Sequence, residues 1–485
     1  MTLESTFLEL EISNINDLKG AYETLSKEVF SSISSCSIIS NEIMDEETLD
    51  FLAREFHTLH CLKTLEGYSL ELKCIVPLEI AQRLLLNFTK LPPHLDKISI
   101  QLPEVLKLLI EESKNVNVSL ENHELIPALK DFLGYLSGST VEEFSLTLNE
   151  ADDCVGKALK ELNSSTCLRN VSKYSFFSHF SNNNIQSWAT KKTFSNKSLL
   201  VDPKFLVDFK IPLLSQMKAL TIQCSKCLTV SSHISNGGKR HCKVQFQSPL
   251  YLETFMNFAN DLGSVDNLEL TIDEPDNTIA ELLGKLHQHP NFKEISRYSL
   301  KLKNPLSDFS DSRQADLVIF RDPKTLYKMQ IHALQFLQDF SFSFKGKSNI
   351  TLDDLCYITK DLQYLKDLKV SLHLREQHPS KFSISSLERI ENLKIKLNFQ
   401  KEGIESLCQQ ISTLKSLKRL NIESVSDNYC SITFKPTVIA SILCHSSNII
   451  DLVIKTHQQT FNLEDLEKYK QNGINKQKLS HQKKE

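Results

Sequence analysis

The sequence predicts an α/β solenoid, a fold in which short strand–helix units stack along one axis. Two observations lead to this prediction. Short segments with apolar residues at every second position recur along the chain, and they alternate with leucine-rich segments whose apolar residues lie three and four apart. Neighbouring copies lie about 20 to 30 residues apart, which is the period of a stacked α/β repeat. We expect the array to cover residues 65–457.

One late repeat illustrates the physical logic. Residues 351–365 place apolar side chains along one face of a helix. Residues 368–374 then read Leu-Lys-Val-Ser-Leu-His-Leu, a period of two that puts the leucines and valine on one face of a strand and the polar residues on the other. Neither element can bury its apolar face alone, so successive repeats must stack.

The same switch from helix to strand recurs in other copies. Parallel strands joined by helices of this length are the expected product. Further strands are expected around residues 68–72, 98–102, 144–148, 267–272, 298–300, 393–399 and 420–422, and helices around 77–91, 124–136, 277–286 and 401–417 and after 248–249.

The alternation of strand and helix patterns is less regular in four regions. Residues 1–64 have helical patterning, and we expect them to form a helical segment that caps the core. Residues 164–215 and 304–330 are more polar and are expected to be irregular repeats or insertions. Residues 458–485 form a lysine-rich tail that we expect to be disordered.

The units at 362–370 (Leu-Gln-Tyr-Leu-Lys-Asp-Leu-Lys-Val) and 414–422 (Leu-Lys-Ser-Leu-Lys-Arg-Leu-Asn-Ile) resemble the leucine-rich repeat in its helix-bearing, ribonuclease-inhibitor-like form. The asparagine that regularly follows the strand in that family is not regular here. The resemblance implies a horseshoe or arc with parallel strands on its concave face and helices outside. It also implies a non-enzymatic scaffold that binds partners, usually proteins, on the concave face.

Composition sets the expected cellular context. No apolar run approaches the roughly 20 residues that span a bilayer, and acidic residues stand near the amino terminus where a secretory signal carries Lys or Arg. The 12 cysteines are scattered, several of them at apolar positions of expected strands and helices, which favours free buried thiols. We therefore expect a soluble intracellular protein, cytoplasmic or nuclear, without membrane contact.

The polar face of the late strands carries the candidate binding residues. If the strands alternate as expected, this face combines six lysines and one histidine with no acid or arginine of its own, and these residues are Lys301, Lys303, Lys345, Lys369, His373, Lys394 and Lys396. Such a basic strip attracts an acidic protein segment or nucleic-acid phosphates. Few aromatic residues point outward there, so the stacking platform of a single-strand RNA reader is missing and a protein partner is favoured. The alternative is a nucleic-acid-associated subunit of a ribonucleoprotein complex.

A cysteine–histidine cluster is the only candidate for a metal site. Cys224, Cys227, His241 and Cys242 have the composition of a zinc site. However, Cys224 and Cys242 continue the apolar phase of their strands, so buried core thiols are the favoured interpretation. We expect no metal, cofactor or small-molecule substrate. No catalytic motif is present, so we do not expect an enzyme.

Residues 102–106 (Leu-Pro-Glu-Val-Leu) match the opening of an F-box, the helical module that docks a ubiquitin-ligase adaptor. The second half of that module is missing. We interpret the segment as the end of a strand followed by a helix that starts at Pro103, which leaves a ligase adaptor with little support.

Overall fold

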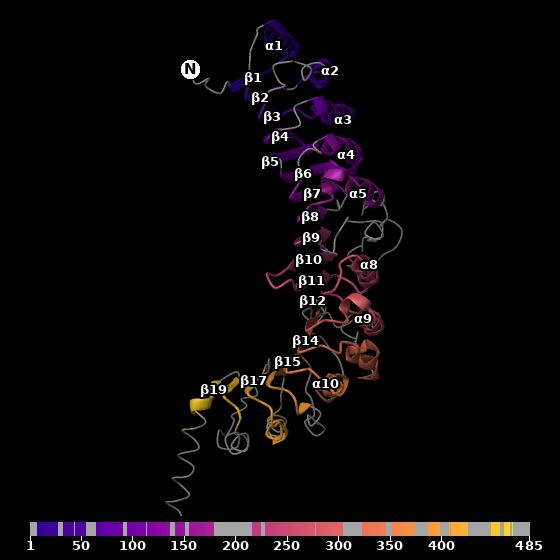
Figure 1. The fold of residues 1–485 in the computed structure, drawn as a ribbon, viewed down its shortest axis with the longest axis vertical. Helices are drawn as coiled ribbons and strands as arrows, with labels where there is room; N and C mark the ends of the chain where they lie inside the picture. Colours follow the sequence, from indigo (N-terminus) through magenta and orange to yellow (C-terminus); the bar gives the residue numbers. More distant parts are fainter. Residues whose placement is uncertain are drawn as a thin grey trace, which may run out of the picture. The chain divides into compact units, whose positions relative to one another are not determined.

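The computed structural model shows alternating strands and helices that belong to two compact units. In each unit the strands lie side by side and helices cover one face of the sheet (Figure 1). The residues that the structure describes are 7–27, 33–42, 44–54, 65–90, 95–112, 114–135, 141–150, 155–178, 216–224, 228–276, 278–303, 323–345, 352–373, 387–397, 407, 409–424, 448–455, 460–465 and 468.

The first unit comprises Met1–Ile234 together with Asn257–Gly263. Each of its strands pairs with the next strand along the chain, and most pairings are parallel. The strands are β1 (Phe7–Glu11), β2 (Ser35–Ser40), β3 (Gly67–Leu72), β4 (Lys97–Leu102), β5 (Leu106–Glu111), β6 (Asn115–Asn122), β7 (Glu143–Glu150), β8 (Lys173–Ser178), β9 (Ala219–Cys224) and β10 (Leu228–Ile234). The helices are α1 (Ile15–Lys27), α2 (Glu46–Arg54), α3 (Leu78–Asn87), α4 (Ile126–Tyr135) and α5 (Val155–Asn163), with 3-10 turns η3 (Phe88–Lys90), η4 (His123–Leu125) and η6 (Thr166–Leu168).

The second unit comprises Ser235–Met256 and Ser264–Glu485. Its strands also pair in chain order, in parallel up to β18. They are β11 (Arg240–Phe246), β12 (Asn267–Ile272), β13 (Arg297–Lys303), β14 (Asp339–Lys345), β15 (Asp367–His373), β16 (Asn392–Leu397), β17 (Arg419–Ser424), β18 (Asp451–Lys455) and the antiparallel β19 (Thr460–Asn462). Its helical elements are α9 (Ile279–Gln288), α10 (Leu352–Thr359), η8 (Pro290–Phe292), η10 (Pro323–Met329) and η11 (Ile331–Ala333), while α8 (Leu250–Ala259) is divided between the two units.

Period-two alternation builds the core of each sheet, as the sequence predicts. In β14 the three phenylalanines Phe340, Phe342 and Phe344 are fully buried, whereas Ser341 and Ser343 between them are partly exposed. Phe340 stacks on Tyr298 of β13, with 5.8 Å between ring centroids. Each strand therefore contributes one apolar face to a continuous core, and its polar face points away from that core.

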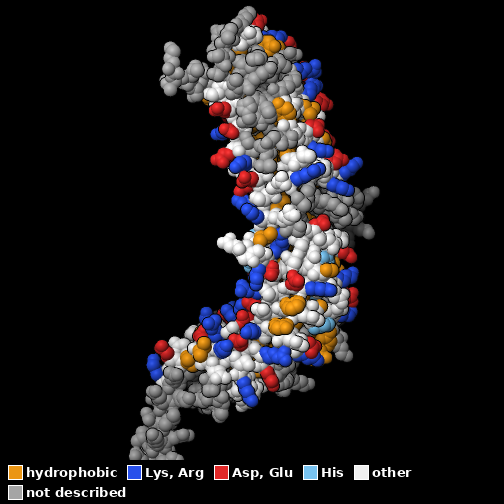
Figure 2. All heavy atoms as spheres, in the orientation of Figure 1, with side chains coloured by type: hydrophobic (Ala, Val, Ile, Leu, Met, Phe, Trp, Pro, Cys, Tyr) orange, Lys and Arg blue, Asp and Glu red, His pale blue; other side chains and the backbone are white. Residues whose placement is uncertain are grey.

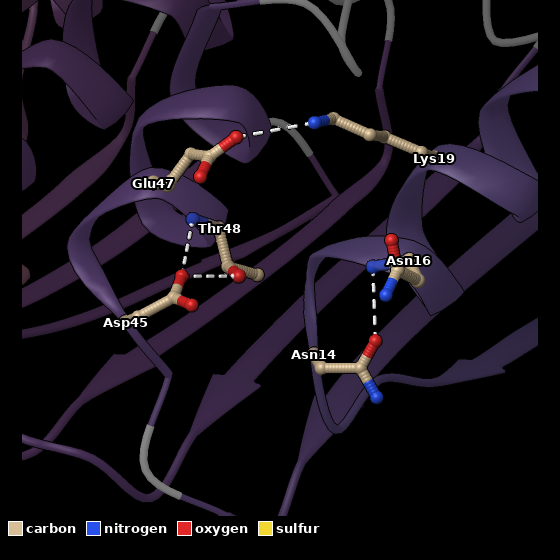
Figure 3. Close-up of polar contacts among 6 residues, drawn as sticks. All are labelled: Asn14, Asn16, Lys19, Asp45, Glu47 and Thr48. Atoms are coloured by element: carbon tan, nitrogen blue, oxygen red, sulfur yellow. Dashed lines mark hydrogen bonds and ion pairs between the residues drawn. The ribbon is translucent and has the colours of Figure 1, made fainter.

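Side-chain caps explain where the first helices begin (Figure 3). Asn14 Oδ1 accepts hydrogen bonds from the backbone N–H groups of Asn16 (2.9 Å) and Asp17 (3.2 Å) at the start of α1. Asp45 Oδ1 accepts from the backbone N–H (2.7 Å) and hydroxyl (2.6 Å) of Thr48 at the start of α2. These bonds satisfy backbone donors that have no partner inside the helix.

The amino-terminal segment contains α1 and α2 as expected, but it also contains two strands. β1 pairs in parallel with β2, and β2 with β3, so the strand–helix alternation begins at Phe7. The sequence signal is weak because β1 has no fully buried residue and half of the residues in β2 are serine.

The expected helix after Pro103 is wrong, and with it the expectation of uninterrupted parallel pairing. Residues 103–105 form a turn, and β5 runs antiparallel to both β4 and β6. Glu104 occupies the left-handed region with φ 56°, which suits a tight reversal of the chain. The F-box match therefore lies on a β-hairpin. A second antiparallel pairing joins β9 and β10.

The expected irregular stretches fall only partly within the described residues. η6 and β8 continue the repeat through residue 178, whereas residues 179–215 and 304–322 lie outside the described residues. η10 packs against α9, where a Cβ added to Gly284 would lie 2.1 Å from the Lys328 carbonyl oxygen. Beyond residue 457, β19 pairs with β18, and most of the expected tail lies outside the described residues.

Candidate partner-binding surface

The parallel register of β13 to β16 brings six sequence-predicted lysines together on one polar face. Lys301 and Lys303 are exposed in β13 between buried leucines, and the strands that follow repeat the alternation. We call this group the lysine strip; it comprises Lys301, Lys303, Lys345, Lys369, Lys394 and Lys396. Lys and Arg side chains gather over this part of the second unit, with acidic side chains among them (Figure 2).

Two pairs within the lysine strip stand directly opposite each other. Lys303 is the register partner of Lys345, and Lys369 is the register partner of Lys394. Neighbouring strands are about 4.8 Å apart, and like charges in direct register destabilise a sheet. Their side chains extend into solvent, which limits the repulsion, yet two such pairs in one small sheet region form a concentrated positive surface.

Acidic residues from neighbouring positions form ion pairs with Lys303, Lys369 and Lys396. Lys303 Nζ lies 3.1 Å from Asp273, Lys369 Nζ lies 3.4 Å from Asp339, and Lys396 Nζ lies 3.1 Å from Glu423. Strand alternation alone does not place these acids beside the lysines, because Asp273 follows β12, Asp339 is the first residue of β14, and Glu423 lies one strand further on. The strand register was the signal that would have revealed them.

Two lysines of the strip keep their charge unpaired among the described residues. Lys301 and Lys394 form no ion pair with any residue that the structure describes. The pKa of Glu423 is lowered, mainly by the hydrogen bond from Lys396 and further by attraction to Lys396, Lys455 and Lys394. A carboxylate placed on this face is therefore held in its charged form by several lysines at once.

The seventh candidate is His373, of which the structure describes the backbone. Its backbone is the register partner of Lys345 at the end of β15, which extends the row formed by Lys303 and Lys345. Its side chain lies outside the described part of the chain.

The sheet face of the first unit differs in chemistry. The central row on β6 to β9 consists of Asn117, Ser145, Ser175 and Thr221, each the register partner of the next. These side chains are short and uncharged. This row of the first unit, unlike the rows of β13 to β16, therefore carries no charge.

The cysteine–histidine cluster is not assembled into a metal site among the described residues. Cys224 in β9 and Cys242 in β11 are both buried, each on the core side of its own unit, and burial raises the pKa of Cys242 to about 12. The His241 ring instead contacts the Asn267 amide, with Nδ1 2.6 Å from Nδ2. Cys227 lies outside the described residues. The described part of the chain holds no group of three or more metal-ligating side chains.

Comparison with known proteins adds no assignment. No protein-family model matches the chain, and no curated protein matches it by sequence. Among the described residues, no helix is long and apolar enough to cross a membrane.

Proposed function

We propose that this protein is a non-enzymatic, leucine-rich-repeat-like scaffold that binds an acidic segment of a partner protein across β13 to β16. The observation that carries the proposal is the direct register of Lys303 with Lys345 and of Lys369 with Lys394. Each pair places two positive charges where one carboxylate of a partner can contact both.

Electrostatics favours such a complex. Like charges directly opposite each other on neighbouring strands destabilise the sheet, and an anion bound between the two ammonium groups removes that repulsion. Exposed ion pairs on their own contribute little, so affinity must come from several carboxylates bound together and from apolar contacts beside them. The strip is therefore suited to steering and orienting an acidic partner.

The acidic residues beside the lysine strip favour a protein over a nucleic acid as the binding partner. Asp273, Asp339 and Glu423 stand among the lysines and would repel an evenly charged phosphate backbone. A protein segment can place its acidic residues over the lysines and neutral residues over the acids. A ribonucleoprotein subunit remains the alternative, and it predicts binding that falls steeply with salt.

The test compares three forms of the tagged full-length protein recovered from its own cells. They are the parent, the double variant Lys301→Glu/Lys394→Glu, and a control variant, Lys97→Glu/Lys107→Glu, which makes the same charge change on the first unit's sheet. Each preparation is divided into nuclease-treated and untreated halves, and the bound proteins are identified.

A partner that survives nuclease, is lost from the strip variant and is retained by the control supports the proposal. A partner set that disappears with nuclease favours the ribonucleoprotein alternative. Equal recovery of nuclease-resistant partners by the parent and the strip variant would refute the role of the lysine strip.

A further inference from the structure

A second surface of the second unit, at the edge where its strands begin, carries exposed aromatic residues at equivalent positions. Phe336 lies three residues before Asp339, the first residue of β14, and Tyr364 lies three residues before Asp367, the first residue of β15. Since Asp339 and Asp367 are register partners, the two aromatic residues occupy the same position in successive repeats. Their rings stack at 6.1 Å between centroids and 19° between planes.

These rings are unusually exposed for their type. Phe336 is 52% exposed and Tyr364 is 54% exposed, whereas the aromatic residues of the strands beside them are buried. Stacking of two rings already gains contact between them, but the outer faces remain open to water. Exposed aromatic residues in a group are a common feature of protein-binding sites.

An arginine occupies the same position in the next repeat. Arg389 lies three residues before Asn392, the first residue of β16 and the register partner of Asp367. Its Nη1 donates a hydrogen bond to the Gln363 carbonyl oxygen at 3.2 Å, which holds the guanidinium beside the segment that carries Tyr364. The fork of an arginine keeps further N–H donors for a carboxylate.

A groove of about 250 Å³ lies between these two repeats, and we call it the rim groove. Lys360, Leu362 and Leu365 line one wall, and Leu387 and Arg389 line the other. Lys360 also lies over the Tyr357 ring, with Nζ 3.7 Å from the ring centroid. The lining thus combines leucine side chains at the base with two cations, against a single acid, Glu388.

We propose that the rim groove binds a short acidic peptide segment of a partner protein that carries an aromatic or aliphatic anchor. A carboxylate of the segment contacts Lys360 and Arg389 in the groove, while the anchor packs beside the groove on the exposed ring of Tyr364. Tyrosine and arginine are the residue types that most often dominate binding energy at protein interfaces. The rim groove shares no residue with the lysine strip, so this proposal does not rest on the one above.

The test selects 12-residue peptides from a randomised phage-displayed library on the full-length protein and measures Kd for the enriched peptides by fluorescence anisotropy. We expect acidic peptides with an aromatic or large aliphatic residue. Their affinity should fall at least tenfold in the variant Tyr364→Ser/Arg389→Glu. The control, Phe7→Ser/Arg169→Glu, likewise replaces an exposed aromatic residue by serine and an exposed arginine by glutamate, but in the first unit, and should bind as the parent does.

Several outcomes would overturn the proposal. These are a failure to enrich any peptide, equal affinity for the parent and the groove variant, or peptides that are basic or lack an apolar anchor. Peptides whose binding is lost only in Lys301→Glu/Lys394→Glu would support the lysine strip and remove the rim groove. A dimer in sedimentation experiments that is lost only in the groove variant would show that a second copy of the chain occupies the groove instead.

Discussion

A buried histidine makes the free energy of unfolding of the second unit depend on pH. His287 in α9 is fully buried, and its Nδ1 donates a hydrogen bond to the Met329 carbonyl oxygen at 2.6 Å. Its Nε2 has no hydrogen-bond partner among the described residues. Burial lowers the pKa of His287 to about 4 from the usual 6.5, although the bond to Met329 opposes the shift. The neutral imidazole is therefore the form that the folded protein holds.

The sign and size of the effect follow from this difference in pKa. Above pH 6.5 the imidazole is neutral in both states, and its titration contributes nothing to the pH dependence. Between pH 6.5 and about 4 the unfolded chain takes up a proton that the folded protein does not, so the free energy of unfolding falls as the pH falls. At about 1.4 kcal/mol for each pKa unit, the loss is about 2 kcal/mol at pH 5 and about 3 kcal/mol when complete.

The assay is urea unfolding followed by circular dichroism at pH 7.5 and pH 5. The parent should lose about 2 kcal/mol more between the two values than His287→Gln, whose amide can still donate to Met329 but does not titrate. If the two units unfold in separate transitions, only that of the second unit should respond. His332→Gln removes an exposed histidine whose charge is the smallest of the contributions to the lowered pKa of His287, so this variant should keep most of the pH dependence of the parent. Equal pH dependence in the parent and His287→Gln would refute the reasoning.

Three further predictions concern stability. Gly284→Ala should lower the free energy of unfolding by roughly 1–3 kcal/mol, because the new methyl group meets the Lys328 carbonyl oxygen. Gly20→Ala, in an open helical position, should instead raise it by roughly 0.5–1 kcal/mol, and thermal unfolding distinguishes the two. Lys394→Gln should weaken the partner complex but leave stability nearly unchanged, because it removes both the repulsion from Lys369 and the attraction to Glu423; a parallel loss of stability and binding would contradict the functional interpretation of the pair.

Local periodicity predicted most of the strand positions because it depends on the burial of each strand alone. The alternation in β13 to β17 is found where expected, and the lysines emerge on the polar face. The hairpin at Pro103 was missed because a proline after a strand is compatible both with a helix start and with a turn. The positive φ of Glu104 favours the turn over the helix, and the sequence does not predict this φ.

The candidate surfaces show a second limit. The acids that pair with the lysine strip and the alignment of Phe336, Tyr364 and Arg389 depend on register between strands, which a single chain reveals only after its repeats are aligned from their first strand residue. Once the first residue of each strand is known, the sequence shows that all three residues occupy the same position of their repeats. The groove beside them depends on side-chain packing, and the sequence does not predict it.

The hairpin of β4 and β5 also affects the geometry of the first unit. In an ordinary repeat each strand advances the sheet by about 4.8 Å, whereas packed helices need about 8–10 Å, and this mismatch makes a repeat array bend with its helices outward. Between α3 and α4, which pack together through Phe88 and Phe132, the sheet gains β5 and β6 without an additional helix. The hairpin therefore lengthens the strand side of the first unit relative to its helix side at this point, which opposes the bend that regular repeats produce.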